Sequence, residues 1–350
     1  MPLLASVRMT CVHSKSKEDP LIKRPIEQVQ SLKLVKRPII ALGEAEDERI
    51  VQGALGAIEL GIADIILVGN TARIKDQLSN FPAAPEGTLE IIDPADAAVT
   101  HELANLFFEK RKHRGVSEQD AHTAVQDPLV FATLLVEAGH ASGTVNGAVY
   151  TTPDVVRAAI QVIGTHPEAS MISSCFLMYL PDGRAMVYSD CGLVIDPSEQ
   201  ELVQIALASA GSSTKLLGKT PKIAMLSFST KGSARHSNVT KVSNATKILN
   251  TDHPHLDVDG ELQFDAAFVP EIGQRKAPES SVAGSANVMI FPNLDAGNIA
   301  YKITERLGGA TALGPILQGL AKPANDLSRG CSASDVTDMI AVTILQGLHA

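Results

Sequence analysis

Short apolar runs alternate with longer amphipathic patterns from residue 37 onward. The β-branched runs "RPIIAL" (37–42) and "ADIILVG" (63–69) flank the helical pattern "EDERIVQGALGAIELG" (46–61), and "ARIKDQLSN" (72–80) precedes the strand-like "TLEIID" (88–93). This alternation is typical of βαβ units, in which a parallel sheet carries helices on both faces. The pattern therefore predicts a first α/β lobe.

A second cycle of strands and helices follows. Strand-like runs include "MISSCFLMYL" (171–180) and "PKIAMLSFS" (221–229), and helical patterns include "EQELVQIALASAG" (199–211) and "AGNIAYKITERLGG" (296–309). The Gly- and Pro-containing stretch "GTHPEA" (164–169) marks the predicted crossing between the two lobes.

The length of the chain supports this division, since 350 residues are enough for two domains of ordinary size. We expect an N-terminal extension over residues 1–35 and a first domain formed by residues 36–166 together with 318–350. Residues 167–317 are expected to form the second domain. The last apolar helical segment, 336–348, then returns to the first lobe.

Composition and net charge indicate which kinds of ligand the protein can bind. Apolar residues make up 45% of the chain, charged residues 20% and aromatic residues only 4%, which is the profile of a compact α/β protein rather than a disordered chain. The formal net charge of −9 argues against binding to nucleic acid, because counterion release needs an excess of Lys and Arg. An anionic ligand must therefore be held by local cations.

The cysteines and the apolar runs bear on localisation. Cys11, Cys175, Cys191 and Cys331 form no CxxC pair, which predicts reduced thiols and a cytoplasmic protein. Apolar runs are too short for a membrane helix or a signal-peptide core, so no membrane partner is expected. The basic opening stretch 1–17 resembles an organelle transit peptide, although a frayed terminus is the simpler account.

Several familiar motifs are missing from the sequence. No GxGxxG stands at a strand-to-helix turn, which argues against a nicotinamide cofactor. The stretch "GSSTKLLGKT" (211–220) has six residues rather than four between its glycines, so it is interpreted as a helix end and a turn rather than a P-loop. Without an HExxH motif, and with the histidines of "DHPH" (252–255) in a predicted loop, no metal site is expected.

The run "NDLSRGCSASD" (325–335) concentrates polar chemistry just before the last helical segment. Ser332 and Asp335 have the spacing of a capping box, which would contribute about 1 kcal/mol to stability and needs no catalysis. The same helix start also offers free N–H groups beside Arg329, whose forked donors suit phosphate. A cap and an anion site are both compatible with this run.

Several long blocks of the sequence, in the same order, resemble the phosphate acetyltransferase (phosphotransacetylase) family. The resemblance is closest to the short form associated with ethanolamine utilisation, and it extends over nearly everything from residue 37. The blocks are "MLSFSTKGSARH" (225–236), "VDGELQFDAAFVPE" (258–271), "NVMIFPNLDAGNIAYKITERLGG" (287–309), "GPILQGLAKP" (314–323) and "NDLSRGCS" (325–332).

This resemblance implies the interconversion of acetyl-CoA and phosphate with acetyl phosphate and CoA. It implies two doubly wound α/β lobes with mainly parallel sheets and an interdomain cleft, in the isocitrate/isopropylmalate dehydrogenase-like superfold. It also implies a homodimer that acts on small molecules, with coenzyme A as substrate and no tightly bound cofactor or metal. The ethanolamine-utilisation type adds the expectation of a bacterial microcompartment.

Three residues of the final run match the family's catalytic positions. Asp335 is implied to take the proton of the CoA thiol, which is mostly protonated at neutral pH because an ordinary thiol has a pKa near ~8.5. Ser328 is implied to donate to the carbonyl oxygen as it becomes an oxyanion, and Arg329 to hold the phosphate. A carboxylate at a helix start is only weakly basic, so positioning must supply much of the advantage.

Other matches are implied to bind CoA and phosphate, and several of them have a structural alternative. The cations at 110–114 before Gly115 are typical of a helix end, and Asn298 is a candidate helix cap. The turn that holds Ser229 and Gly232 is equally typical of a plain connection between elements. The expected binding residues are Arg111, Arg157, Thr151, Thr152, Ser229, Gly232 and Asn298.

Three alternatives to this mechanism and activity stay open. Cys331 suggests an acetyl-enzyme thioester, whereas the family is understood to transfer the acetyl group directly in a ternary complex. A longer acyl group, such as propionyl or butyryl, fits the same reaction centre. A catalytically silent acetyl-CoA sensor is a third reading, because the same fold serves as a regulatory appendage on malic enzyme.

Overall fold

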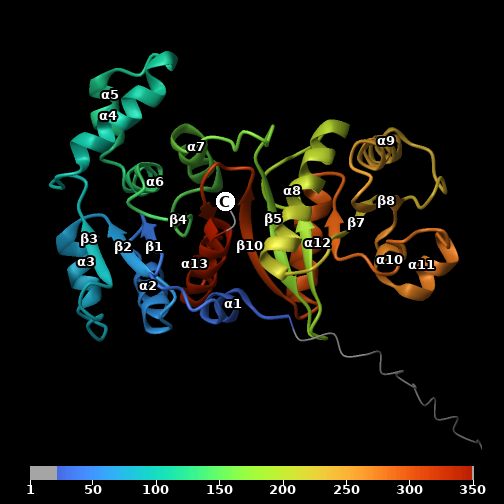
Figure 1. Ribbon diagram of the computed structural model, residues 1–350, viewed down its shortest axis with the longest axis horizontal. Helices are drawn as coiled ribbons and strands as arrows, with labels where there is room; N and C mark the ends of the chain where they lie inside the picture. Colours follow the sequence, from blue (N-terminus) through green and yellow to red (C-terminus); the bar gives the residue numbers. More distant parts are fainter. Residues whose placement is uncertain (1–21, 349–350) are drawn as a thin grey trace, which may run out of the picture.

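Two β-sheets form the framework of the protein, and helices cover both faces of each sheet (Figure 1). The computed structural model describes residues 22–348. The first lobe comprises α1 (Pro25–Ser31), β1 (Ile39–Leu42), α2 (Glu48–Glu59), β2 (Asp64–Val68), α3 (Thr71–Leu78), β3 (Leu89–Ile92), α4 (Thr100–Arg111), η1 (Lys112–Arg114), α5 (Glu118–Ala124), α6 (Pro128–Ala138), β4 (Gly143–Asn146), α7 (Thr152–Val162), β11 (Ala324–Asp326) and α13 (Ala333–Leu348).

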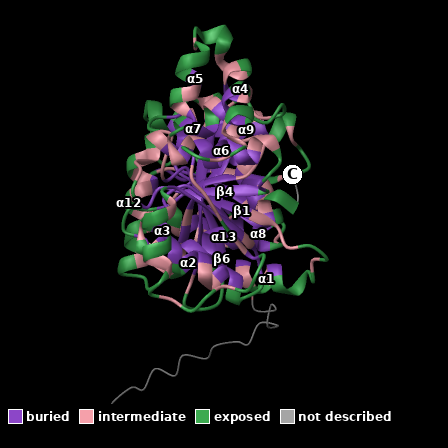
Figure 2. Ribbon diagram, turned by 90° about the vertical axis from the view of Figure 1, so that its left-hand side faces the viewer, coloured by how far each residue is buried: buried purple, intermediate pink, exposed green. Residues whose placement is uncertain are grey.

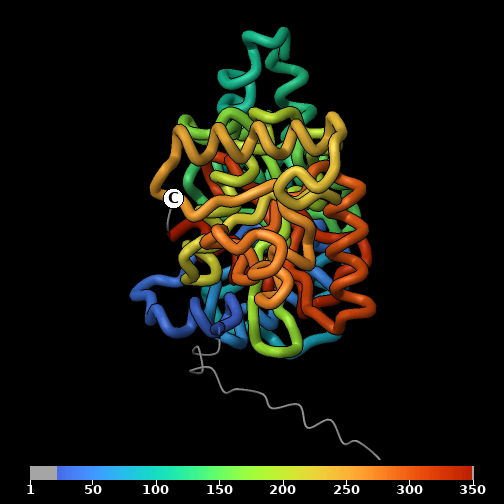
Figure 3. The backbone as a smooth tube through the Cα atoms, turned by 90° about the vertical axis from the view of Figure 1, so that its right-hand side faces the viewer, coloured from blue at the N-terminus to red at the C-terminus, as the bar shows by residue number. Residues whose placement is uncertain are grey.

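The second lobe is formed by the intervening part of the chain. Its elements are β5 (Ser173–Tyr179), β6 (Ala185–Ser189), α8 (Glu199–Leu217), β7 (Lys222–Leu226), α9 (Ser237–Asp252), β8 (Asp257–Leu262), α10 (Phe264–Phe268), α11 (Pro270–Lys276), β9 (Val288–Ile290), α12 (Leu294–Arg306) and β10 (Thr311–Gln318). Figure 3 faces this lobe, with α9 in gold and α12 in orange-red.

The first sheet has the order β11-β4-β1-β2-β3, and all its strands are parallel. Alternate residues of β1 face opposite layers: Ile40 and Leu42 pack toward α2 and α13, and Ala41 packs toward α4 and α6. Since both faces are covered, the strands are nearly continuous apolar runs, as the sequence pattern predicts. Buried residues accordingly concentrate in the strands between the helix layers (Figure 2).

The second sheet has the order β10-β5-β6-β9-β7-β8. Its β10–β5 and β5–β6 pairs are antiparallel, and the three other pairs are parallel. The two-lobed, mainly parallel α/β fold expected from the sequence is confirmed. The P-loop-like stretch is the end of α8, where Gly218 adopts a left-handed conformation with φ 62°.

The helix α13 ends the described part of the chain and lies against the first lobe. It packs against α2 and β4 and also contacts α8 of the second lobe. A Cβ on Gly53 of α2 would lie 2.5 Å from the Cβ of Val336, so the absence of a side chain allows the two helices to approach closely. This contact sets the first turn of α13 directly against α2.

The crossing between the lobes consists of two segments that lie side by side. Residues 164–169 run from α7 to β5, and Thr165 forms an isolated bridge with Leu320 on the returning segment. The strands of the first sheet come from residues 39–146 and 324–326, and those of the second from residues 173–318. The domain boundaries proposed from the sequence stay a prediction.

Two further features lie at the edges of the molecule. Within the expected N-terminal extension, residues 1–21 fall outside the described residues, while α1 packs against α13, and Arg24 beside it donates to the Thr311 hydroxyl over 3.2 Å. The hairpin of α4 and α5 projects from the body (Figures 1 and 2). Within residues 22–348, no helix combines the length and the apolar character that a bilayer crossing needs.

Candidate active site

Ser332 and Asp335 open α13 with reciprocal hydrogen bonds. The Ser332 N–H and hydroxyl donate to Oδ2 of Asp335 over 2.8 and 2.9 Å, and the Asp335 N–H donates to the Ser332 hydroxyl over 3.2 Å. This is the predicted capping box, which satisfies donors that a helix start leaves without partners. No hydrogen bond among residues 22–348 ends on Oδ1. One carboxylate oxygen is therefore available to a ligand.

The turn between β11 and α13 exposes its side chains. Ser328, Arg329 and Gly330 are exposed, while Leu327 before them and Cys331 after them are buried and anchor the turn. The Cys331 N–H closes the turn on the Ser328 carbonyl over 2.9 Å. Within the described residues, the Ser328 hydroxyl accepts one long bond, from the Gly330 N–H at 3.3 Å. Its own proton is therefore free to be donated.

A pocket of about 240 Å³ lies between this turn and the second lobe. Ser328 and Asp335 both line this pocket, and they are not hydrogen-bonded to each other. From the first lobe it is lined by Leu327, Ser328, Gly330, Cys331, Asp335 and Met339, and from the second by Phe176, Tyr301, Lys302, Glu305, Arg306, Ala312, Leu313 and Gly314.

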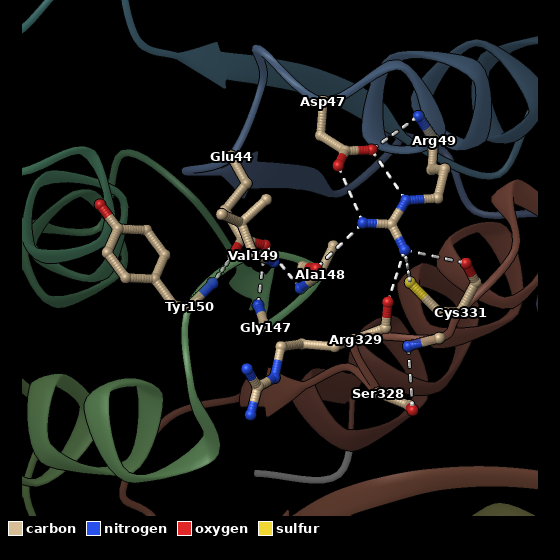
Figure 4. A network of polar contacts seen from close by, with 11 residues as sticks. Glu44, Asp47, Arg49, Gly147, Ala148, Val149, Tyr150, Ser328, Arg329 and Cys331 are labelled. Atoms are coloured by element: carbon tan, nitrogen blue, oxygen red, sulfur yellow. Dashed lines mark hydrogen bonds and ion pairs between the residues drawn. The ribbon is translucent and has the colours of Figure 1, made fainter.

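Arg329 lies on another side of the turn. Its guanidinium points away from the Ser328 hydroxyl, to the side on which the loop Gly147–Tyr150 lies (Figure 4). Arg329 does not line the pocket, although it is exposed on the same turn. The structure therefore brings Ser328 and Asp335 to one cavity and leaves Arg329 beside it.

The backbone of the turn is held by Arg49, at the start of α2. The Nη1 group of Arg49 donates to the carbonyls of Arg329 and Cys331 over 2.7 and 3.2 Å. Its Nη2 group donates to the Ala148 carbonyl over 2.9 Å, in the loop after β4. Asp47, the N-cap of α2, accepts from Nε and Nη2 over 2.9 and 2.8 Å (Figure 4). One guanidinium thus joins three loops at the carboxyl edge of the first sheet.

The loop after β4 is held by a second charged residue, Glu44. Its buried carboxylate accepts from four successive backbone N–H groups, those of residues 147–150, over distances of 2.6 to 2.8 Å (Figure 4). Hydrogen bonds to a carboxylate are stronger than those between neutral groups, so this loop is firmly set. The sequence analysis missed Glu44 and Arg49. The charged cluster "EAEDER" (44–49) directly after a strand was the available signal.

The two predicted threonines differ in their surroundings. The Thr152 hydroxyl donates to Oδ2 of Asp326 over 2.5 Å, and Asp326 ends the strand that leads into Ser328. Burial raises the pKa of Asp326 to about 7, and its Oδ1 has no hydrogen-bond partner among the described residues. The Thr151 hydroxyl donates to Asp154 over 2.6 Å. Both threonines therefore stand at the start of α7, but only Thr152 is bonded to the strand that leads into the turn.

The two predicted CoA-binding arginines lie on other helices. Arg157 projects from α7 with its side chain 61% exposed and pairs with Asp154 at 3.0 Å. Arg111 is the last residue of α4, on the projecting hairpin, where Gly115 closes η1 in a left-handed conformation with φ 83°. Arg157 is exposed and Arg111 is half-buried, and neither lines the pocket beside Ser328.

The strand-end turn after β7 is closed by its own contacts. Ser229 is fully buried, and its hydroxyl donates to Oε1 of Glu261 over 3.0 Å. The Gly232 N–H donates to the same oxygen over 2.7 Å, with a φ of 80° that favours glycine. Their donors are thus already engaged by Glu261, and their predicted contact with substrate stays a prediction.

The alternative role of Asn298 as a helix cap is wrong. The N-cap of α12 is Asn293, whose extended backbone lets its side chain accept from the Ala296 N–H over 3.0 Å. Asn298 lies further inside the helix, and its Nδ2 group donates to the Cys191 carbonyl over 3.0 Å. Asn298 therefore links α12 to the segment after β6.

A larger cavity lies elsewhere and contains none of the predicted site residues. It measures about 480 Å³ and lies between α8 and the segments that connect the lobes, with Gln204, Ser212 and Gln318 in its wall. Within residues 22–348, no three His, Cys, Asp or Glu side chains are grouped as metal ligands would be. The chemistry-bearing cluster therefore lies at the smaller pocket.

Comparisons with known proteins agree with this geometry. The family described as "Phosphate acetyl/butaryl transferase" matches residues 22–344. The phosphate acetyltransferase of Acetivibrio thermocellus is 44% identical over 315 residues, covering 89% of this chain and 94% of that protein. The phosphate acetyltransferase of Paracoccus denitrificans is 44% identical over 329 residues, covering 92% and 99%.

Solved structures give the same result. The EutD phosphotransacetylase from Staphylococcus aureus matches with a TM-score of 0.84 at 39% identity, covering 92% of this chain and 98% of that chain. A phosphotransacetylase from Streptococcus pyogenes matches with a TM-score of 0.87 at 41% identity, covering 93% and 98%. The expected resemblance is confirmed over nearly the whole length. This chain therefore belongs to the phosphate acetyltransferase family of acyltransferases.

Proposed function

We propose that this chain transfers an acetyl group between coenzyme A and phosphate at the pocket between its lobes. The observation that carries the proposal is that Ser328 and Asp335 line one cavity at the start of α13. The name of the curated relatives, phosphate acetyltransferase, supplies the substrate class. Coenzyme A acts here as a substrate that enters and leaves.

Asp335 is proposed as the base for the CoA thiol. Its Oδ2 is occupied by the cap, which fixes the carboxylate, and its Oδ1 is left to receive the proton. As the sulfur attacks the carbonyl carbon of acetyl phosphate, a C–S bond forms and the C–O bond to phosphate breaks. The electron pair of the broken bond leaves with the phosphate. Holding thiol, carbonyl and carboxylate together supplies much of the rate gain.

Ser328 and Arg329 are proposed to stabilise the charge that develops in this step. The Ser328 hydroxyl has its proton free to donate to the carbonyl oxygen as it becomes negative. Arg329 is exposed on the same turn, and exposed side chains change rotamer within nanoseconds, so its guanidinium can turn to hold the phosphate. The N-terminus of α13 adds a positive dipole at the same place.

Direct transfer is favoured over an acetyl-enzyme on Cys331. Burial raises the pKa of the Cys331 thiol above its ordinary value, and the nearby Arg49 opposes this shift. At neutral pH such a thiol is protonated and therefore a poor nucleophile. Both substrates are accordingly proposed to bind together before the acetyl group moves.

The remaining expectations concern substrate binding and assembly. Arg111 and Arg157 are proposed to bind the anionic parts of CoA, since both are cations of the first lobe, Arg157 exposed and Arg111 half-buried. Thr151, Thr152 and Asn298 are proposed to contact the substrates. A cytoplasmic homodimer is proposed from the family, with a bacterial microcompartment as the location to test.

The activity is tested by mixing the protein with acetyl phosphate and CoA and following thioester absorbance. We expect a signal that depends on both substrates, with heat-treated protein as the control. The family description includes butyryl transfer, so propionyl and butyryl phosphate are compared in the same assay. No signal with any acyl phosphate would refute the proposal, and a higher kcat/KM for butyryl phosphate would change the substrate.

A further inference from the structure

The Arg49 guanidinium uses every N–H that it carries. Its five N–H directions meet the two carboxylate oxygens of Asp47 and the carbonyls of Ala148, Arg329 and Cys331, at distances of 2.7 to 3.2 Å. Its side chain is only one-third exposed, at 33%, and its Nη1 group also lies 3.8 Å from the Cys331 sulfur. No donor remains for a substrate, so Arg49 acts on its neighbours.

The contacts of Arg49 determine which groups the turn presents. The carbonyls of Arg329 and Cys331, the residues on either side of Gly330, accept from Arg49, and Arg49 does not line the pocket. A carbonyl oxygen that faced the pocket would repel phosphate and a developing oxyanion. With these two oxygens bound by Arg49, the turn lines the pocket with Ser328, Gly330 and Cys331, and Ser328 brings a hydroxyl donor.

Asp47 fixes the Arg49 side chain in place. Asp47 accepts from the Arg49 N–H as the N-cap of α2 and grips the guanidinium through both carboxylate oxygens. Bidentate Arg–carboxylate pairs fix geometry as well as adding energy. The close packing of Gly53 against Val336 holds α2 and α13 together just beyond the turn. The turn is therefore fixed from its side by Arg49 and from its end by α13.

We propose that Arg49 is a positioning residue that holds the turn Ser328–Cys331 in the orientation needed for acetyl transfer. This proposal rests on the proposed function and goes beyond it by assigning a role to a residue 280 positions away from Arg329. The Arg49 side chain touches neither acetyl phosphate nor CoA. Its effect is exerted through the backbone of the turn.

Arg49→Lys is the first test, because an ammonium keeps the charge but cannot reach one carboxylate and three carbonyls at once. We expect kcat to fall about 100-fold, which is the scale expected from a misplacement of about 1 Å, while the KM for CoA changes less than about threefold. The matched control is Arg73→Lys, which alters an exposed ion pair to Glu46 of the same β1–α2 loop and is expected to leave both constants unchanged.

Asp47→Asn is the second variant, in case Arg49→Lys does not fold. An asparagine oxygen still caps α2 but no longer grips the guanidinium through two charged oxygens, so we expect a smaller loss of kcat, about tenfold. Both kcat values are divided by the folded fraction from thermal unfolding, so that a purely structural effect cancels. An unchanged kcat in both folded variants would overturn the proposal.

Hydrogen exchange gives a reading that does not depend on activity. We expect the amides of residues 328–332 to exchange faster in Arg49→Lys than in the wild type, with residues 227–234 unchanged as an internal control. If these amides exchange faster in Arg49→Lys but the wild type does not transfer acetyl groups, Arg49 still positions the turn and the proposed function is refuted. Unchanged exchange with a lowered kcat would overturn positioning, because Arg49 would then act on the substrates themselves.

Discussion

Two strand-end turns of this protein are rich in hydroxyls and glycine, yet they differ in which hydrogen-bond donors they leave free for a ligand. After β11, Arg49 binds backbone carbonyls, and the side chains of Ser328 and Arg329 are exposed. After β7, Glu261 binds the Ser229 hydroxyl and the Gly232 N–H, so these two donors are already engaged. The first turn presents donors to a cavity, and the second is closed.

The sign of the charge that binds each turn explains this difference. A guanidinium has only donors, so it binds acceptors of the turn and leaves the donors to a ligand. A carboxylate has only acceptors when ionised, so it binds the donors. Phosphate and a developing oxyanion both need donors. A turn backed by an arginine is therefore suited to this chemistry, and a turn backed by a glutamate is suited to a structural role.

The largest expected effect is that of Asp335→Asn. The asparagine oxygen still accepts from Ser332, so the helix cap is kept, but the proposed base is lost and kcat should fall about 10²- to 10⁴-fold. Steady-state assays and thermal unfolding measure the two effects. Asp120→Asn is the control, because Ser117 and Asp120 form the same capping box away from the pocket. Full activity per folded molecule of Asp335→Asn would mean that Asp335 serves only as a helix cap.

Ser328→Ala should have the next largest effect. Loss of one donor to an oxyanion costs about 10²- to 10³-fold in kcat, whereas the exposed hydroxyl makes only one long bond, so stability should change by less than about 0.5 kcal/mol. Initial rates and urea unfolding separate the two quantities. A loss of stability with an unchanged kcat would mean that Ser328, like Ser229, has a structural role only.

The carboxyl group beneath the first turn should make stability depend on pH. Because burial raises the pKa of Asp326 to about 7, the folded state keeps a proton that the unfolded state loses near pH ~4. The unfolding free energy should therefore fall by up to about 1.4 kcal/mol per pH unit between these values. The contribution of Asp326 is complete below this window and lost as pH rises through 7.

Asp326→Asn isolates this contribution from that of other carboxyls, such as Asp338, whose pKa burial raises to about 6. Urea unfolding of both proteins from pH 5 to 8 measures the difference in unfolding free energy. We expect the wild type to lose stability relative to the variant as pH rises. Parallel curves would mean that Asp326 does not titrate in this range.

The smallest expected effect is that of Ser229→Ala. Its hydroxyl donates to buried Glu261, so its loss should lower the unfolding free energy by about 1 kcal/mol. Urea unfolding and the KM for each substrate are measured together. An increased KM without a loss of stability would restore the ligand contact predicted from the sequence, and the contrast between the two turns would then fail.

Features that depend on near neighbours along the chain could be predicted from the amino-acid sequence. Periodicity predicted the strands and helices, the spacing of Ser332 and Asp335 predicted the cap, and the spacing of glycines in residues 211–220 predicted the end of α8. These signals are local because strand pleating, helix pitch and capping act over a few residues. The blocks that resemble the family added the reaction, which the comparisons support.

Which polar groups are left without a partner depends on contacts between distant parts of the chain. Nothing near Ser229 in the sequence reveals that Glu261, 32 positions later, binds its hydroxyl. Likewise, Arg49 and the turn that it holds are 280 positions apart. The pocket beside Ser328 and Asp335 also needs α12 and β10 of the second lobe to complete it. Folding pairs hydrogen-bonding groups across such distances, and local patterns carry no record of those pairs.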